Sequence, residues 1–283
     1  MASMKDIKRR KTSVQSTQQI TKAMKLVSTV KLQKARANAE NSNPFFNHMY
    51  ETIHSILRKS EGINHPYLNT PESEKVGVVV VSANRGLAGG YNSNIIKMIT
   101  GMEIPKEQIE IYAIGTKGRD GLQSRGYHIA EDFSPYVEGP TYEDARVVSR
   151  RILADFAEGK IGAIHLVYTH FKNTVVHVPT ALQLLPVQME ETEASSDEVP
   201  MNFEPSEEEV LDELIPKYVT SLIYGALVEA VASENGARMQ AMDSATSNAE
   251  EIISDLSLKY NRARQGAITQ ELTEIIAGAS AIS

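Results

Sequence analysis

The residues that could bind a phosphate form a glycine-rich run, Gly86-Leu87-Ala88-Gly89-Gly90. The run follows an expected strand and precedes an expected helix, where free backbone amides can hold an anion. It has neither the Lys-Ser/Thr pair of a P-loop nor the G-x-G-x-x-G spacing of a dinucleotide site. A tight strand-to-helix turn that needs glycine for positive φ is therefore favoured over nucleotide binding.

The histidines are the next candidates, as metal ligands or general bases. They stand at positions 48, 54, 65, 128, 165, 170 and 177. His165 and His170 are five residues apart in an expected strand, so they face opposite sides. His170 and His177 could meet across a hairpin, but no carboxylate pattern accompanies them. Structural or exposed histidines are favoured, and no metal site is predicted.

The candidate nucleophiles are weak. Ser149 or Ser244 would need a positioned base and oxyanion donors, and the spacing Gly-x-Ser-x-Gly does not occur. The chain contains no cysteine, which excludes disulfides, thiolate metal sites and cysteine nucleophiles. We therefore predict no catalytic, cofactor-binding or metal-binding residue, and expect a chain that is not an enzyme by itself.

A very long helix is expected over residues 217–281, which follow Pro216 without another proline. Sixty-odd residues at 1.5 Å rise span roughly 95 Å, far beyond the ordinary globular helix. Another body must bury such a rod. Its apolar steps of three or four predict a coiled-coil seam, preceded by a row of small residues that permits close backbone approach. The seam is Ala249, Ile252, Leu256, Tyr260, Ala263 and Ala267, and the upstream row is Ala230, Ser233, Gly236, Met239, Met242 and Ala245.

A second long helix is expected over residues 3–43, which contain no proline or glycine. Pro44 is expected to kink or end it, with helix resuming over 45–61. Its apolar stripe is Ile7, Val14, Ile20, Met24, Val27 and Val30. Ten basic residues stand in this segment against Asp6 and Glu40. Such a rod could face nucleic acid or an acidic protein, or it could be a solvated face. The bases are spread around the helix and stacking aromatics are missing.

Between the two helices the pattern changes to a small α/β domain. Strands are expected at 75–81, 109–114, 127–130, 161–171 and 175–186, with helices at 92–102, 119–125 and 142–158. Alternating strands and helices imply a three-layer arrangement. The predicted fold is α+β: a long antiparallel coiled coil of the N- and C-terminal helices with an inserted Rossmann-like α/β domain. The expected divisions are 1–60, 75–189, 190–213 and 214–283.

Segment 190–213 is expected to be an acidic linker, because it carries eleven acidic residues and no base. One short strand around 199–203 is conceivable within it. The whole chain of 283 residues has a formal net charge of −7. No apolar run approaches 18 residues, so no transmembrane helix is expected. The first ten residues have no apolar core after their charges and do not read as a secretory signal.

Five segments carry a resemblance to a known family. They are 268–281 (ITQELTEIIAGASA), 237–246 (ARMQAMDSAT), 260–265 (YNRARQ), 19–28 (QITKAMKLVS) and 84–92 (NRGLAGGYN). Together they resemble the γ subunit of F-type ATP synthases of the bacterial type, and the resemblance covers essentially the full chain. Departures from the family pattern stand at Lys11, Gln15, Ser16, Lys25 and Ala88.

The resemblance implies a central rotor shaft, which couples ion-driven rotation of a membrane c-ring to ATP synthesis or hydrolysis at β-subunit sites. It implies α, β and ε subunits and the c-ring as partners. It implies neither nucleic acid nor a membrane span. The expected location is the cytoplasmic face of the bacterial cell membrane, peripherally attached. Two other hypotheses remain open, namely a nucleotide-binding regulatory α/β domain on a coiled-coil arm and a nucleic-acid-binding coil.

The resemblance also implies contact residues on the shaft. Met24 and Lys25 are expected where it passes the acidic lever regions of β. The expected contacts with the loops of the ring's upper collar are Arg262, Arg264, Gln265, Thr269 and Gln270. Ile275 and Ile276 are expected in the sleeve that acts as a bearing. As an alternative, Met24, Ile275 and Ile276 would be coiled-coil core, and Arg264 and Gln265 a solvated helix face.

Overall fold

The structure is a computed structural model that describes residues 4–59, 65–69, 73–187 and 206–282. It contains two compact units, Met1–Ser28 with Met239–Ser283, and Thr29–Arg238. Two long helices, α1 (Met4–Lys59) and α5 (Glu207–Ile282), contribute residues to both units. The conceivable strand at 199–203 lies outside the described residues.

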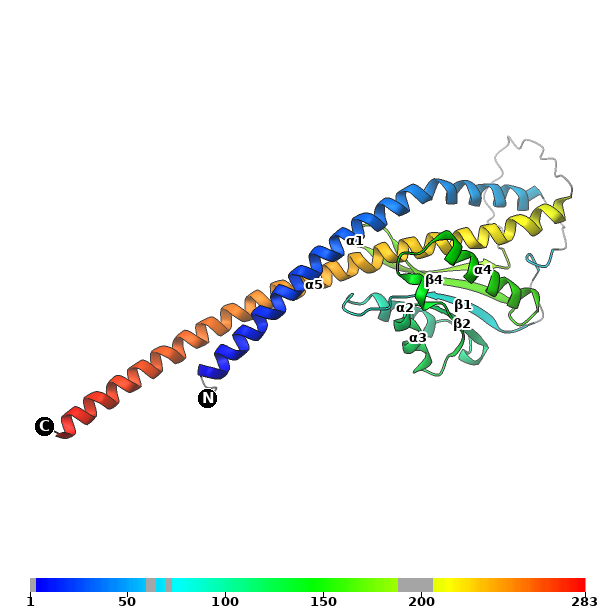
Figure 1. Cartoon of the computed structure of the whole chain (residues 1–283). Helices are drawn as coiled ribbons and strands as arrows, with labels where there is room; N and C mark the ends of the chain where they lie inside the picture. Colours follow the sequence, from blue (N-terminus) through cyan, green and yellow to red (C-terminus); the bar gives the residue numbers. More distant parts are fainter. Residues whose placement is uncertain (1–3, 60–64, 70–72, 188–205, 283) are drawn as a thin grey trace. The chain divides into compact units, whose positions relative to one another are not determined.

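A five-stranded sheet lies at the centre of the larger unit (Figure 1). Its strands are β1 (Val76–Val81), β2 (Ile109–Ile114), β3 (His128–Asp132), β4 (Ala163–Phe171) and β5 (His177–Leu185). The order is β3-β2-β1-β4-β5, with every pair parallel except the β4–β5 hairpin. The β-branched run of β1 is buried on both faces, as expected of a central parallel strand. The predicted Rossmann-like sheet is therefore confirmed.

The connecting helices cover both faces of this sheet. They are α2 (Tyr91–Thr100), α3 (Thr116–Gln123) and α4 (Tyr142–Ala157), with short 3₁₀ turns η1 (Lys106–Gln108) and η2 (Ser134–Val137). The chain steps from β1 to β3 through α2 and α3, and then returns across β1 to β4 through α4. Because parallel crossovers are right-handed, this reversal places α4 on the opposite face from α2 and α3.

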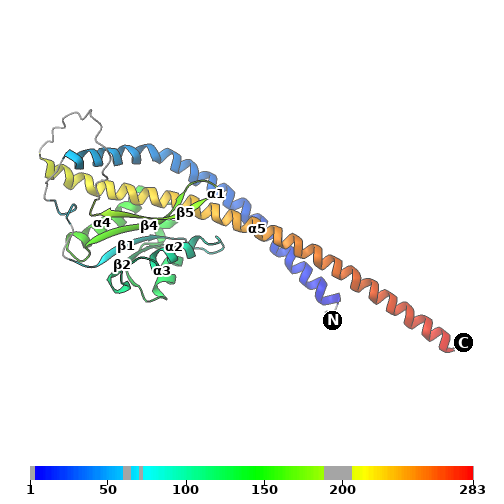
Figure 2. The ribbon, with the colours of Figure 1, turned by 180° about the vertical axis from the view of Figure 1, so that it is seen from behind.

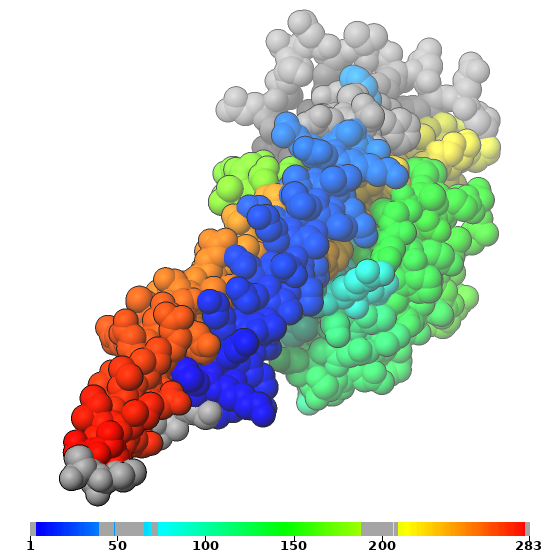
Figure 3. All heavy atoms as spheres, turned by 60° about the vertical axis from the view of Figure 1, so that its left-hand side comes forward, coloured from blue at the N-terminus to red at the C-terminus, as the bar shows by residue number. Residues whose placement is uncertain are grey.

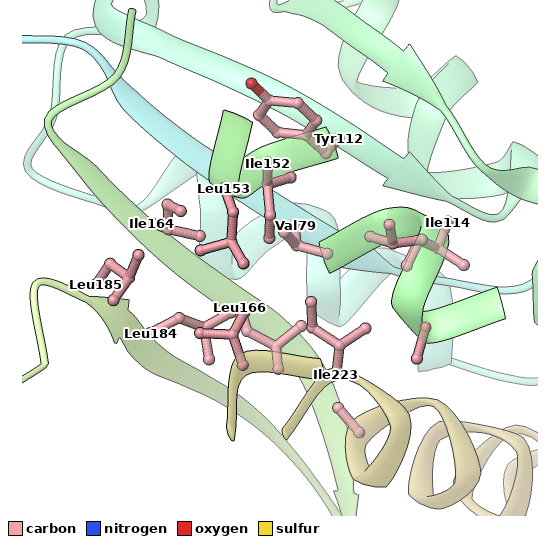
Figure 4. Packing of buried hydrophobic residues seen from close by; sticks show 14 of the residues in the cluster. Val79, Tyr112, Ile114, Ile152, Leu153, Ile164, Leu166, Leu184, Leu185 and Ile223 are labelled. Atoms are coloured by element: carbon pink, nitrogen blue, oxygen red, sulfur yellow. The ribbon is translucent and has the colours of Figure 1, made fainter. Parts of the chain in front are cut away.

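Alternation along the strands separates two hydrophobic cores. Val78 and Val80 of β1 pack with Ile95 and Ile99 of α2 and Leu122 of α3. Val79 and Val81 point the other way, toward α4 and a stretch of α5. Figure 4 shows Ile223 of α5 facing Leu166 and its neighbours on the sheet. This stretch of α5 is therefore a core element of the α/β domain.

The part of α5 that packs on the sheet is apolar enough to resemble a membrane-spanning helix. By length and composition α5 could cross a membrane, but 56% of its most apolar 18-residue window is buried within the protein. The fully buried residues of this stretch include Leu211, Ile215, Val219, Ile223 and Leu227. Its apolar character is accounted for by packing on the sheet.

The smaller unit is an antiparallel pair of helices. Three contacts join them: Gln18 Nε2 donates to Glu250 Oε1 at 3.0 Å, the Thr21 and Thr246 hydroxyls lie 2.8 Å apart, and Lys25 Nζ lies 2.5 Å from Asp243 Oδ1. Residue numbers rise along α1 while they fall along α5, so the predicted antiparallel coil is confirmed. Figure 2 shows from behind the sections of α1 and α5 that lead to the N- and C-termini.

The seam on α5 differs from the predicted one at two positions, Ile252 and Ala267. Ile252 is 43% exposed and Ala267 is exposed, whereas Ile253 is half-buried. The inward positions are Met242, Thr246, Ala249, Ile253, Leu256, Tyr260 and Ala263, which alternate steps of four and three. Choosing Ile252 was wrong because the two adjacent isoleucines are equally apolar, and only the 3.5-residue repeat distinguishes them.

The predicted apolar stripe of α1 was also partly wrong. Ile20, Val27 and Val30 are exposed, and Leu26 between them is exposed as well. The inward positions of α1 in the smaller unit mix apolar and polar residues. Met4, Ile7, Lys11, Val14, Gln18, Thr21, Lys25 and Ser28 are buried or half-buried. Hydrogen bonds to α5 satisfy several of these polar groups, so the seam does not follow hydrophobicity. Helix α1 also continues through Pro44 to Lys59, so it does not end at this proline.

Replacing Ile223 with Ala should destabilise the α/β domain by about 2–5 kcal/mol, because it leaves a cavity between α5 and the sheet. Urea unfolding of the full chain, followed by circular dichroism, would measure this change. Val147→Ala on the exposed side of α4 is the matched control and should change stability little. An equal loss in both variants would contradict a core role for α5.

Candidate functional site

The most exposed part of the molecule is the end of α5. Every residue from 264 to 280 is exposed, although the helix continues to Ile282. An apolar row runs along it through Ile268, Leu272, Ile275 and Ile276, the last 64% exposed. Figure 3 shows this red end uncovered on the face turned to the viewer. An exposed helix with an apolar row is suited to contact another protein.

The predicted contact residues of this end lie on one continuous helix. Arg262, Arg264, Gln265, Thr269 and Gln270 are all exposed. The Thr269 hydroxyl donates to the Gln265 carbonyl at 2.9 Å, and Gln270 Nε2 donates to Glu274 Oε1 at 2.9 Å. Both interactions stay within α5. The structure thus places these residues on the same exposed section of α5 as Ile275 and Ile276.

Met24 and Lys25 lie apart from that end, on α1. Both are half-buried, and Lys25 makes the ion pair with Asp243 of α5. Lys25 therefore occupies an inward position of the coil, and part of its charge is balanced there. The departure at Lys11 also falls on an inward position, where the long aliphatic stem of lysine can pack while its ammonium group reaches water.

The carboxyl ends of the parallel strands are the edge of an open α/β sheet where ligands bind, and the start of α3 lies at this edge, after β2. Here the amides at the start of α3 have protein partners. Thr116 N donates to Asn84 Oδ1 at 2.9 Å, Lys117 N to the Ala83 carbonyl at 3.0 Å, and Gly118 N to Ser82 Oγ at 2.8 Å. These amides are therefore not available to hold a phosphate.

Helix α5 lies against the glycine-rich turn at the switch point between β1 and β4. The Tyr91 hydroxyl donates to the Ala230 carbonyl at 3.3 Å, and Ala237 packs on Ala83, Ala88 and Tyr91. Burial, followed by the charge of Glu234, raises the pKa of Tyr91 well above its usual range. The crevice in which a nucleotide would lie is thus lined by residues of α5.

The glycine-rich turn carries backbone strain. Gly89 has φ 56°, which confirms the expected positive φ, but Leu87 has φ 62° as well. Leu87 is also 64% exposed, so its side chain gains little from packing. A non-glycine residue in the left-handed region costs of order 1–3 kcal/mol and persists only where its surroundings fix it. No sequence pattern distinguished Leu87 from its neighbours.

The described histidines do not assemble into a ligand set. His170 is opposite Val178 and His177 is opposite Phe171, so these two imidazoles are not cross-strand partners. Instead each contacts α5. His170 Nδ1 lies 2.7 Å from Glu229 Oε2, and His177 fills the space above Gly236. Among the described residues, no group of three or more His, Cys, Asp or Glu side chains is placed to hold a metal ion.

The most buried carboxylate, Asp155, has structural partners. Tyr112 Oη donates to Asp155 Oδ2 at 2.8 Å, while Lys160 Nζ and Arg151 Nη1 approach Oδ1 at 3.0 and 3.3 Å. Burial opposes ionisation, but these hydrogen bonds and charges outweigh it and lower the pKa of Asp155. A carboxylate held ionised by two cations is a poor proton donor or acceptor near neutral pH.

The contact between α5 and the β4–β5 hairpin is the feature that the sequence left unassigned. Its one signal was Gly236 inside a helical pattern, since a glycine there usually has a packing reason. A side chain added at Gly236 would overlap the His177 ring. The steps of three among small residues indicated close approach, but they could not name the partner.

Comparison with known proteins gives a consistent result over the full length. A sequence model of the family described as "ATP synthase" matches residues 3–282. The "ATP synthase gamma chain" of Lachnoclostridium phytofermentans is 60% identical over 291 residues, which cover 100% of both chains. The protein of the same description from Alkaliphilus metalliredigens is 45% identical over 285 residues, covering 99% of this chain and 98% of that protein.

Solved structures agree on the fold. A chain of the Euglena gracilis mitochondrial ATP synthase, from a structure titled OSCP/F1/c-ring, aligns with a TM-score of 0.70 and 17% identity, covering 99% of this chain and 94% of that chain. A chain of the Tetrahymena thermophila mitochondrial ATP synthase, titled central stalk/c-ring, aligns with a TM-score of 0.58 and 24% identity. That alignment covers 80% of this chain and 99% of the other.

The half-buried His177 should make stability depend on pH. Burial lowers its pKa from the ordinary 6.5, so the unfolded chain takes up this proton at a higher pH than the folded chain does. Keeping His177 neutral therefore costs no stability above about pH 6.5. Below that pH the free energy of unfolding falls, by at most about 1.4 kcal/mol per pH unit, until the pH reaches the pKa of His177 in the folded chain. Urea unfolding between pH 8 and pH 5.5 would measure it. His177→Gln should reduce the pH dependence without abolishing it, because burial also lowers the pKa of His165, whereas His128→Gln, exposed on β3, should leave the dependence unchanged.

Proposed function

The chain belongs to the family of ATP synthase gamma chains, and we infer that it is the central rotor shaft of an F-type ATP synthase. One observation carries the mechanism. The antiparallel pair of α1 and α5 ends in an exposed, uninterrupted helix over residues 264–280. A helix of that length with an apolar row and no covering element in its own unit is suited to be enclosed by other chains.

The mechanism rests on unequal contact. A shaft made from two different helices has no rotational symmetry, so it cannot touch three catalytic β subunits in the same way. Each orientation stabilises one state of each β subunit over another, by the difference in contact free energy. Rotation therefore shifts nucleotide affinity at the three sites in turn, and hydrolysis can drive rotation by the same coupling.

We propose that the chain is itself non-catalytic and that its partners are the α and β subunits, ε and the membrane c-ring. Two features support the first point: the amides of α3 have protein partners, and Asp155 is paired with cations. The titles of the similar structures, which name F1 and a c-ring, support the second. The proposed location is peripheral, at the cytoplasmic face of the bacterial membrane.

The proposed contact residues divide into three groups along the shaft. Met24 and Lys25 of α1 would pass the acidic levers of β, although Lys25 also binds Asp243. Five polar residues of α5 would face the loops of the upper collar: Arg262, Arg264, Gln265, Thr269 and Gln270. Ile275 and Ile276 would lie in the apolar bearing. Their exposure supports this assignment, since a large apolar side chain is rarely left in water without a partner.

We propose one role for each of the predicted segments. Residues 1–60 and 214–283 would form the shaft, 75–189 the α/β body that receives torque, and 190–213 an acidic connection. Helix α5 begins at Glu207, so the last residues of that connection are already helical.

A nucleotide-binding regulatory domain is the alternative, and it is not favoured. In the α/β domain, residues Ala230 and Ala237 of α5 lie against Tyr91 and the glycine-rich turn at the switch point, and the first amides of α3 donate to protein acceptors.

Co-expression with α and β subunits of a related bacterial enzyme tests the function directly. We expect a stable ATPase complex that contains one copy of this chain. Purification of an active α–β complex from which this chain is absent would contradict the shaft role.

Removing residues 265–283 should lower ATP synthesis driven by an ion gradient by about tenfold or more, which corresponds to about 1.4 kcal/mol of lost coupling. The deleted helix holds the proposed collar and bearing contacts. Inverted membrane vesicles carrying the whole complex provide the measurement. Glu271→Gln, on the same exposed helix, is the control and should keep synthesis near the unmodified level. Unchanged synthesis after the deletion would contradict direct contacts by this end.

A further inference from the structure

We propose that α5 residues 229–238 form the joint that locks the shaft helix to the α/β body, so that torque enters the shaft through directional contacts at this position. The proposal rests on the rotor function inferred above and adds the place and the residues of the mechanical connection. All of these residues belong to the larger unit.

One side of the joint is the β4–β5 hairpin. Three residues of α5, spaced by four and three, contact it from one face of the helix. Glu229 Oε2 lies 2.7 Å from His170 Nδ1, the Ser233 hydroxyl donates to the Thr169 carbonyl at 3.0 Å, and Gly236 lies under the His177 ring. The hairpin is thus attached along two full turns of α5.

The other side of the joint is the glycine-rich turn. The Tyr91 hydroxyl donates to the Ala230 carbonyl at 3.3 Å, Ala237 packs on Ala83 and Ala88, and Arg238 Nη2 donates to the Gly86 carbonyl at 3.4 Å. Arg238 is also paired with Glu234 on the preceding turn of α5. These contacts account for the strained turn, because Leu87 holds its left-handed backbone in a loop fixed by α5 on one side and by Asn92, which accepts from Ala83 N, on the other.

The hydrogen bonds of the joint restrain rotation of α5 about its own axis, whereas the apolar contacts of the core restrain it less. Hydrophobic burial is non-directional, so the contacts of Ile215 or Ile223 allow small rotations of α5 about its own axis. Hydrogen bonds weaken steeply when they are misaligned. Bonds on two sides of α5 therefore oppose rotation and sliding together. This stretch is buried without large apolar residues, with Ala232 and Ser233 among its buried positions, and the Ser233 hydroxyl donates to the Thr169 carbonyl of the body.

Gly236 adds a steric restraint. A Cβ at this position would overlap the His177 ring, so the helix and the hairpin are as close as a backbone and a ring allow. His177 in turn packs on Phe171 of β4, with ring centroids 6.0 Å apart. A ring wedged between a backbone and a second ring cannot move without moving the hairpin.

The test separates torque entry from catalysis. Two near-isosteric variants, Ser233→Ala and Tyr91→Phe, each remove one directional bond, and Gly236→Val separates α5 from His177. Each is assembled into the whole complex. We expect ion-driven ATP synthesis to fall by about threefold or more in the double variant Ser233→Ala/Tyr91→Phe, and further in Gly236→Val, because overpacking shifts both partners. ATP hydrolysis by the soluble α–β–γ complex should stay within about twofold, since the end of α5 is unchanged.

Matched controls are Arg150→Ala and Ala154→Val, both on the exposed side of α4. Circular dichroism and thermal unfolding confirm that each variant is folded, and the isosteric pair keeps the test valid if Gly236→Val does not fold. Unchanged synthesis in the double variant would overturn the joint. A parallel loss of hydrolysis and synthesis would also overturn it, because it would indicate a structural role only. Failure of the unmodified chain to assemble would instead refute the rotor function.

Discussion

Burial of the first half of α5 against the sheet is the constraint on which the rest of the larger unit depends. Ile215, Val219, Ile223 and Leu227 close a core that β1, β4 and α4 cannot close alone. The α/β domain is therefore incomplete without a helix that begins after residue 205 of the chain. This is a strong form of coupling, because the body cannot be fully packed unless the helix that leaves it is in place.

The same helix uses different interactions at successive positions. Large apolar side chains are buried first, small and polar residues come next around Gly236, an alternating seam of threes and fours follows, and an exposed end completes it. Each section is matched to what it touches: a sheet, a hairpin and turn, a second helix, and, in the proposed complex, the surrounding subunits. A uniform apolar stripe would suit none of the later sections, because it would bind α1 too continuously and leave no polar surface for the collar.

The α1–α5 pair achieves specificity with polar contacts. Gln18, Thr21 and Lys25 occupy inward positions that a leucine would fill in a simple coiled coil, and each finds a partner on α5. Polar inward positions lower stability but fix register. Several apolar side chains of α1, Ile20, Leu26 and Val27 among them, are instead left on its outer surface. For a shaft that works inside other proteins, an outward apolar face is compatible with function.

The amino-acid sequence by itself determined the two long helices, the alternation of strands and helices, the five strands and the antiparallel return, because helix propensity, β-branched runs and glycine turns act locally. It also carried the motifs at 268–281 and 84–92 that identified the family. Tertiary structure alone decided that Ile253 rather than Ile252 faces inward, that α1 turns polar residues inward, that Leu87 holds a positive φ, and that α5 lines the switch-point crevice. These outcomes depend on which surfaces meet. A contact between Gly236 and His177, or between Tyr91 and Ala230, joins residues far apart in the chain, and no local pattern of either segment specifies the other.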